Sequence, residues 1–160
     1  MKVFLMDPEK CTGCRLCELS CSLTRYGAFN RELSAIRVES NEDLSLHVPV
    51  SCMQCREAPC IRACVAGALR RDSGTGAVLV DADRCILCKA CAVACPFGCV
   101  SLVRWKDAPR IGICDLCSGE PQCVSVCRSQ AIAYVDEGKV NRKKRMEDYE
   151  RVFHNRSTES

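Results

Sequence analysis

Residues 11–21 read C-T-G-C-R-L-C-E-L-S-C, and residues 85–95 repeat the same cysteine spacing as C-I-L-C-K-A-C-A-V-A-C. Residues 52–64 (C-M-Q-C-R-E-A-P-C-I-R-A-C) and 114–127 (C-D-L-C-S-G-E-P-Q-C-V-S-V-C) keep both ends of that spacing, but their middle gaps widen to four and five residues. Each widened gap contains a proline, which indicates a small turn. These four quartets account for sixteen of the seventeen cysteines in the chain.

The C-x2-C-x2-C-x3-C spacing of the first and third quartets is that of bacterial ferredoxins. Three cysteines spaced in this way lie on a tight loop that can wrap three irons of a cubane. The fourth cysteine is predicted on the first turn of a short helix, where it faces away from the loop and toward a neighbouring cluster. We therefore expect a [4Fe–4S] site at each quartet, and four clusters in the chain.

Structural zinc and a disulfide framework are the main alternatives for so many cysteines. Zinc sites favour separated C-x2-C pairs, often with histidine, but these triplets are compact, and His47 and His154 lie outside every quartet. Disulfides need an oxidising compartment. The start M-K-V-F-L-M-D-P-E-K shows no signal peptide or twin arginine, and the chain has no run of about 18 apolar residues. We therefore expect a cytoplasmic protein without a membrane span, whose thiols are free to bind metal.

The composition also favours bound metal as part of the structure. Aromatic residues make up only 5% of the 160 residues and charged residues 27%, which leaves little for an ordinary apolar core. Bound clusters would supply the missing stability, because metal-binding free energy becomes folding free energy. The formal charge of +3 does not indicate nucleic-acid binding, because four clusters with their thiolates, at about −2 each, would take it to about −5.

The segments between the quartets have the alternating pattern of short β-hairpins. The predicted strand pairs are 34–39 with 44–50, 69–72 with 77–80, and 100–104 with 110–113. The sequence S-G-T-G at 73–76 suits a hairpin turn, and a last strand is expected over 131–135. The recurring order of ligand loop, short helix and short strand predicts an α+β fold of ferredoxin-like units.

Two features lie outside the quartets. Cys99 follows C-P-F-G, and we expect it to be a small buried packing residue, with a substitute ligand or a redox thiol as the alternative. Residues 139–160 form a charged C-terminal tail that begins K-V-N-R-K-K-R. The tail is either a solvated terminus or a docking segment for a partner subunit.

The quartets also carry a family resemblance over residues 1–135. The second quartet and the stretch C-D-L-C-S-G-E-P-Q-C at 114–123 resemble the electron-transfer subunits of the dimethyl-sulfoxide-reductase iron–sulfur family. Similar subunits accompany formate dehydrogenases, hydrogenases and carbon monoxide dehydrogenases. The opening C-T-G-C-R-L-C-E-L-S-C-S-L, with G-A-F-N at 27–30, looks most like the polyferredoxin subunits of tungsten aldehyde oxidoreductases.

This resemblance implies two pseudo-symmetric ferredoxin-like units. Quartets one and four would build an outer unit from residues 1–30 and 105–138, and quartets two and three an inserted inner unit from residues 31–104. Each fourth cysteine would cross to the neighbouring cluster of its unit. The implied ligand sets are Cys11, Cys14, Cys17 and Cys127 (set A); Cys114, Cys117, Cys123 and Cys21 (set B); Cys52, Cys55, Cys60 and Cys95 (set C); and Cys85, Cys88, Cys91 and Cys64 (set D). The four clusters would then form a row.

The chain shows no apparatus for catalysis of its own. It has no Gly-rich phosphate loop, no recognisable carboxylate pair and no nucleophile with a base. An enzyme with substrate on an open iron would need an incomplete quartet, and every quartet is complete. We therefore expect a non-catalytic electron-transfer subunit in anaerobic metabolism.

The resemblance implies a catalytic oxidoreductase subunit as partner, together with a flavin or ferredoxin partner. A row of clusters that ends at the surface would also allow copies of the chain to associate into a longer conduit. Tungsten aldehyde oxidoreductase is the first choice for the catalytic subunit. The alternatives are carbon monoxide dehydrogenase, formate dehydrogenase, hydrogenase, or a free soluble polyferredoxin with no fixed partner.

Overall fold

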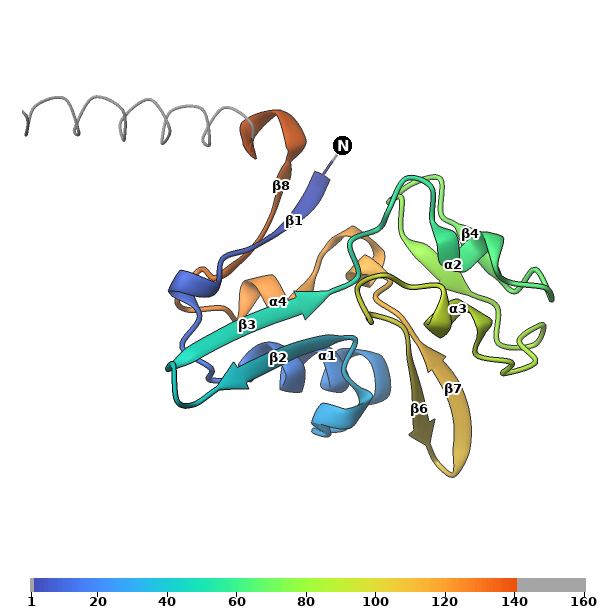
Figure 1. The fold of residues 1–160 in the computed structure, drawn as a ribbon, viewed down its shortest axis with the longest axis horizontal. Coiled ribbons are helices and arrows are strands. Elements are labelled where there is room, and N and C mark those ends of the chain that lie inside the picture. Colours follow the sequence, from blue (N-terminus) through green and yellow to red (C-terminus); the bar gives the residue numbers. More distant parts are fainter. Residues whose placement is uncertain (1, 141–160) are drawn as a thin grey trace, which may run out of the picture.

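The computed structural model describes residues 2–140 and shows small antiparallel ribbons joined by short helices (Figure 1). The strands are β1 (Lys2–Met6), β2 (Ile36–Asn41), β3 (Leu46–Ser51), β4 (Leu69–Arg71), β5 (Val78–Val80), β6 (Ser101–Trp105), β7 (Ala108–Gly112) and β8 (Ile132–Asp136). The helices are α1 (Leu16–Tyr26), α2 (Pro59–Arg62), α3 (Ala90–Val93) and α4 (Gln122–Ser125), with 3-10 turns η1 (Pro8–Lys10), η2 (Arg31–Leu33) and η3 (Leu116–Gly119). The predicted charged tail lies outside the described residues from position 141 onward.

The three predicted hairpins are confirmed as the pairs β2–β3, β4–β5 and β6–β7. The β6–β7 connection is tighter than predicted. Only Lys106 and Asp107 separate these strands, and both have positive φ, as a two-residue hairpin turn with the right-handed twist of its strands requires. In the β4–β5 turn, the Asp72 carboxylate accepts hydrogen bonds from the backbone N–H and the hydroxyl of Thr75, at 2.8 and 2.7 Å.

The fourth ribbon joins the two ends of the cysteine-rich region. β1 pairs antiparallel with β8, from Lys2 opposite Asp136 to Met6 opposite Ile132. The pairing continues into the loop, where the Asp7 N–H donates to the Ala131 carbonyl at 2.8 Å. Sequence analysis predicted β8 but not β1. The ribbon brings the segment that leads into Cys11 beside the segment that follows Cys127.

The helices begin earlier than predicted relative to the cysteines. In every quartet the third cysteine is helical, and the fourth lies two residues beyond the helix in three of the four. The prediction that the fourth cysteine lies on the first turn of a helix is therefore wrong, and Cys21 is helical only because α1 is longer. The physical reason is a left-handed residue that starts the helix just before the third cysteine, as at Arg15, Ala58 and Lys89.

The helices pack in the pairs that bring distant quartets together. α1 packs against α4, so the first quartet lies beside the fourth, and α2 packs against α3, so the second lies beside the third. In Figure 1, α2, α3 and β4 group together on the right, away from the β1–β8 ribbon. The core between these elements consists of cysteines and small or β-branched side chains, with Leu33, Ile36 and Ile113 among the most deeply buried.

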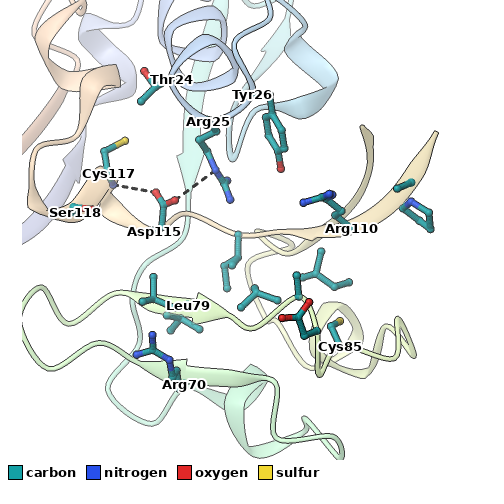
Figure 2. Close-up of a pocket in the computed structure, with 18 of the residues that line it drawn as sticks. Thr24, Arg25, Tyr26, Arg70, Leu79, Cys85, Arg110, Asp115, Cys117 and Ser118 are labelled. Atoms are coloured by element: carbon teal, nitrogen blue, oxygen red, sulfur yellow. Dashed lines mark hydrogen bonds and ion pairs between the residues drawn. The ribbon is translucent and has the colours of Figure 1, made fainter. Parts of the chain in front are cut away.

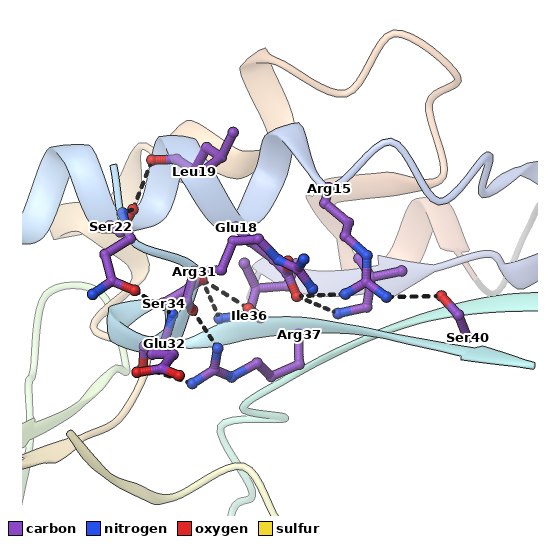
Figure 3. Close-up of polar contacts among 12 residues, drawn as sticks. Arg15, Glu18, Leu19, Ser22, Arg31, Glu32, Ser34, Ile36, Arg37 and Ser40 are labelled. Atoms are coloured by element: carbon purple, nitrogen blue, oxygen red, sulfur yellow. Dashed lines mark hydrogen bonds and ion pairs between the residues drawn. The ribbon is translucent and has the colours of Figure 1, made fainter. Parts of the chain in front are cut away.

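A buried carboxylate fastens α1 to the β2–β3 ribbon (Figure 3). The Glu18 side chain is only 2% exposed, and its two oxygens accept from the Val38 backbone N–H at 2.9 Å and from Arg31 Nε at 2.5 Å. Arg15 Nη1 lies 3.5 Å from the same carboxylate, and Arg15 Nη2 donates to Ser40 Oγ at 3.1 Å. Because a buried charge is tolerated only when it is paired and hydrogen-bonded, this network fixes the helix that carries Cys17 and Cys21.

Candidate iron–sulfur sites

The four ligand loops share a backbone conformation that their sequences do not suggest. In each loop the residue two positions after the first cysteine is left-handed: Gly13 (φ 67°), Gln54 (φ 48°), Leu87 (φ 57°) and Leu116 (φ 59°). Left-handed residues other than glycine are uncommon and tend to cluster at functional sites. The repeated turn therefore marks four equivalent loops, each bending so that its first two cysteines can face a common space.

Gly13 also meets a second constraint. A Cβ atom at this position would lie 2.7 Å from the imidazole ring of His47, which is closer than real Cβ contacts allow. His47 is held in place by Ser40, whose Oγ lies 2.9 Å from His47 Nδ1. The β2–β3 ribbon therefore packs directly on the first ligand loop, and His47 acts as a packing residue there.

Three cavities each contain in their walls the four cysteines of one implied ligand set, which come from two different quartets, and one of the three cavities is also lined by Cys99. Cavity B is lined by Cys21, Cys114, Cys117 and Cys123; cavity C by Cys52, Cys55, Cys60 and Cys95; and cavity D by Cys64, Cys85, Cys88 and Cys91. These groups coincide with the implied ligand sets B, C and D. Ligation itself stays a prediction.

The cysteines of set A lie on the first loop and at the end of α4. Cys11 and Cys14 are close enough to Cys17 that their charges, after burial and the neighbouring Glu18, help to raise the pKa of Cys17 to about 12. Helix α4 lies against α1, where Ser20 Oγ donates to the Gln122 carbonyl at 3.4 Å. Cys127 follows this helix and is only partly buried.

Burial favours the protonated form of several of these thiols by raising their pKa. It raises the pKa of Cys52 to about 12 and that of Cys114 to about 11, and it also raises the pKa of Cys123. Beyond burial, Cys64 and Cys85 raise the pKa of Cys91, so thiols from two quartets interact there. Since only thiolates bind metal well, loading these sites must displace protons.

Backbone N–H groups point at three of the four crossing cysteines, a feature that sequence analysis missed. The N–H of Ala68 donates to Cys64 Sγ at 3.2 Å, and that of Cys99 donates to Cys95 Sγ at 3.4 Å. In both cases the donor lies four residues after the cysteine. The donor to Cys21 Sγ is instead the N–H of Ala35, at 3.4 Å. Hydrogen bonds of this kind stabilise thiolate ligands and tune the potential of a cluster.

Cys99 packs against the core as predicted, although it is only partly buried. Its thiol also lies 3.1 Å from the Ser51 carbonyl, to which it donates, and it lines cavity C. The Cys99 side chain thus forms part of the wall of that cavity, and its backbone N–H donates to Cys95 there.

The cavities follow one another through the molecule. Cys17 of set A contributes to the raised pKa of Cys123 of set B, and Cys114 of set B contributes to that of Cys52 of set C. Sets C and D are joined by α2 and α3, which carry or precede members of both. Cys14 and Cys88, in sets A and D, are the exposed cysteines, so both ends of the series reach the surface.

The donor sets suit a [4Fe–4S] cluster. All seventeen cysteines are free thiols. Within residues 2–140, no three His, Cys, Asp or Glu side chains converge on one position as a single metal ion requires. The cysteines instead surround cavities with room between the sulfurs. Cavity B is also lined by Arg25, whose Nη1 is a buried nitrogen without a hydrogen-bond partner among the described residues. An acceptor inside the cavity would satisfy it.

Comparison with known families agrees with this geometry. Residues 44–137 match the family described as 4Fe-4S dicluster domain, and residues 8–27 match the 4Fe-4S binding domain. Together with the cysteine-lined cavities, these matches define a ferredoxin-type iron–sulfur protein. The chain belongs to the 4Fe-4S dicluster domain family, whose match covers more than half of its length.

Several curated relatives carry electron-transfer names. The chain is 45% identical over 123 residues to the polyferredoxin-like subunit of an aliphatic sulfonate oxidoreductase from Pyrococcus furiosus, covering 77% of this chain and 69% of the relative. It is 34% identical to the putative electron transport protein YsaA of Escherichia coli, covering 88% and 94%. It is 35% identical to PhsB, the thiosulfate reductase electron transfer subunit of Salmonella typhi, covering 88% and 79%.

A solved structure titled as the active site complex BamBC of benzoyl coenzyme A reductase contains a chain with 26% identity and a TM-score of 0.48. The alignment covers 86% of this chain and 80% of that one.

Among residues 2–140, no helix is long and apolar enough to cross a membrane.

Proposed function

We propose that the chain is the electron-transfer subunit of an oxidoreductase complex, and that it holds four [4Fe–4S] clusters. When bound, such clusters supply one-electron transfer, while the protein supplies their ligands, spacing and electrostatic surroundings. The observation that carries this proposal is the set of cavities B, C and D, each of which contains in its wall four cysteines of one implied set drawn from two quartets. The chain would not be catalytic by itself.

The ligand sets A to D are part of the proposal, as is the division into an outer unit (1–30 with 105–138) and an inserted inner unit (31–104). Packing of α1 on α4 and the β1–β8 ribbon support the outer unit. Packing of α2 on α3 supports the inner one. The exposed Cys14 and Cys88 lie at opposite ends of the series, which suits entry of electrons at one end and exit at the other.

The catalytic partner is proposed to be an oxidoreductase of the tungsten aldehyde oxidoreductase type, with a flavin protein or a ferredoxin as the second partner in an anaerobic cytoplasm. The 45% identity to the polyferredoxin-like subunit of an aliphatic sulfonate oxidoreductase supports a place for this chain in an oxidoreductase complex. A free polyferredoxin is the rival, and a chain that always elutes alone from its native cells would favour it.

Iron and acid-labile sulfide per chain, measured on anaerobically purified protein, test the number of clusters. Four clusters require about sixteen of each per chain. Cys99→Ala is the matched control, because it removes from the wall of cavity C a thiol that is not a proposed ligand, and it should keep the full content. A content of about twelve or less in intact, freshly purified protein would contradict the four-cluster proposal.

A further inference from the structure

Arg25 lies in the last turn of α1 and faces two spaces at once. It lines cavity B with Cys21, Cys114 and Cys117, and it also lines a larger open cleft between α1 and the β4–β5 and β6–β7 ribbons. Figure 2 shows its side chain reaching from α1 toward Asp115, with Arg70 on the opposite wall of the cleft. Arg25 is thus the arginine shared by the cysteine-lined cavity and the open cleft.

The structure holds the guanidinium group of Arg25 in place. Its Nε lies 3.6 Å from Asp115 Oδ2, and its Cζ lies 5.6 Å from the centroid of the Tyr26 ring. The Arg25 side chain is only 16% exposed. Asp115 is itself fixed, because its other oxygen accepts the Cys117 N–H at 3.0 Å. Arg25 is therefore positioned by two neighbours beside a cysteine of set B.

One nitrogen of the Arg25 guanidinium group takes part in neither of these contacts. Arg25 Nη1 is buried and has no hydrogen-bond partner among residues 2–140. A buried donor on a charged group is costly when it has no acceptor. Such a group in a native structure calls for an unseen acceptor. Arg25 lines cavity B, whose acceptors are the sulfur atoms of its four cysteines together with the side chains of Ser51 and Asp115.

We propose that Arg25 tunes the cluster held by Cys21, Cys114, Cys117 and Cys123, by donating a charge-assisted hydrogen bond from Nη1 to a sulfur of that site and so raising its reduction potential. This proposal rests on the proposed function, because it needs a cluster in cavity B. Reduction by one electron from the redox partner makes the site more negative. A fixed positive charge in a partly buried position therefore favours the reduced form.

Among the residues that the structure describes, cavities C and D have no buried, positively charged side chain comparable to Arg25. Cavity C has no charged side chain in its wall, and the charged residue of cavity D, Lys89, is exposed to solvent. Solvent weakens the field of an exposed ammonium group. Arg25 is a positioning residue rather than a ligand, and its effect should be confined to one of the four sites.

The test is an anaerobic redox titration followed by electron paramagnetic resonance, on cluster-loaded protein with Arg25→Gln, Arg25→Lys and Arg70→Gln. The resonance of the site in cavity B is identified as the one that Cys123→Ala removes. In Arg25→Gln its midpoint potential should shift downward, and Arg25→Lys should restore part of the shift. Arg70→Gln removes the same charge from the same open cleft without lining cavity B, and it should leave the potential unchanged.

Iron and sulfide are measured on every variant, so that the two proposals can fail separately. Full cluster content in Arg25→Gln with no shift in potential would overturn the role of Arg25, and so would an equal shift in Arg70→Gln. If Arg25→Gln loses the cluster, the neutral variant Arg25→Met is titrated in its place, and a loaded Met variant at the wild-type potential also overturns the role. A wild-type chain without a cluster in cavity B would instead overturn the proposed function.

Discussion

At the residue scale, Gly13 decides how closely the first ligand loop can approach the β2–β3 ribbon. Gln54, Leu87 and Leu116 occupy the equivalent left-handed position in the other loops, so that conformation does not by itself require glycine. The first loop differs because the His47 ring fills the space where a Cβ would lie. The glycine is needed here for room more than for backbone freedom.

Gly13→Ala should therefore destabilise the loaded protein by about 1–3 kcal/mol, the usual cost of overpacking. The temperature at which visible cluster absorbance is lost should fall, and iron should be lost first from the site of set A. The double variant Gly13→Ala/His47→Ala should recover most of the loss, because the clash is with the His47 ring. Gly74→Ala is the control, since its Cβ would meet only ordinary contact at 3.5 Å. A Gly13→Ala protein as stable as the wild type would contradict the argument.

At the element scale, the Glu18 network shows how an 11-residue helix is held against a two-stranded ribbon. Glu18→Ala leaves the buried Val38 N–H without its acceptor and Arg31 without its partner. We expect a loss of about 2–3 kcal/mol, below the usual cost of breaking a buried ion pair, because the Arg31 side chain is 49% exposed and can turn to water.

Thermal loss of cluster absorbance measures this change as well. The control is Glu57→Ala, whose ion pair with Arg62 spans 3.8 Å between side chains that are 83% and 69% exposed. Exposed pairs contribute little, so the control should shift stability by no more than about 0.5 kcal/mol. Equal effects of the two substitutions would show that the buried network does not fasten α1.

The same scale shows what the sequence could predict. The three local hairpins were predictable, because each pairs segments separated by a short turn with alternating polarity. β1 was not, because among residues 2–140 it pairs with the distant strand β8 alone, and five residues give no pattern without that partner. The predicted helix starts were too late along the chain, because nothing in the sequence marks a residue such as Lys89 as left-handed. Only the backbone of the structure shows that conformation.

At the scale of the whole molecule, the proposed crossing of each fourth cysteine to a neighbouring site would close the fold. The cysteine spacing predicted the four loops, and the family resemblance supplied the grouping that cavities B, C and D support. The Arg25 contact and the N–H donors to sulfur were not predictable, because each depends on how segments far apart in the sequence pack or on the exact path of a loop. Spacing identifies ligands, whereas tertiary packing decides what surrounds them.

The crossing itself gives the sharpest whole-molecule prediction. Cys127→Ala should remove or alter the same paramagnetic signal as Cys11→Ala, because both would belong to set A. Cys123→Ala, four residues earlier in the same quartet, should affect a different signal, that of set B. Electron paramagnetic resonance of the reduced variants compares the three. If Cys127→Ala and Cys123→Ala remove the same signal, quartets contiguous in sequence are the ligand sets and the crossing is wrong.

The β1–β8 ribbon has a consequence for biosynthesis. β1 leaves the ribosome about 130 residues before β8 is made, and at about 5–20 residues per second that interval is roughly 7–26 s. During this time β1 has no strand to pair with, while residues 52–95, which contain both inner ligand sets, are already complete. With the proposed ligand sets, the nascent chain can therefore receive its inner clusters first, and the site at Cys11 is finished only after Cys127 has been made.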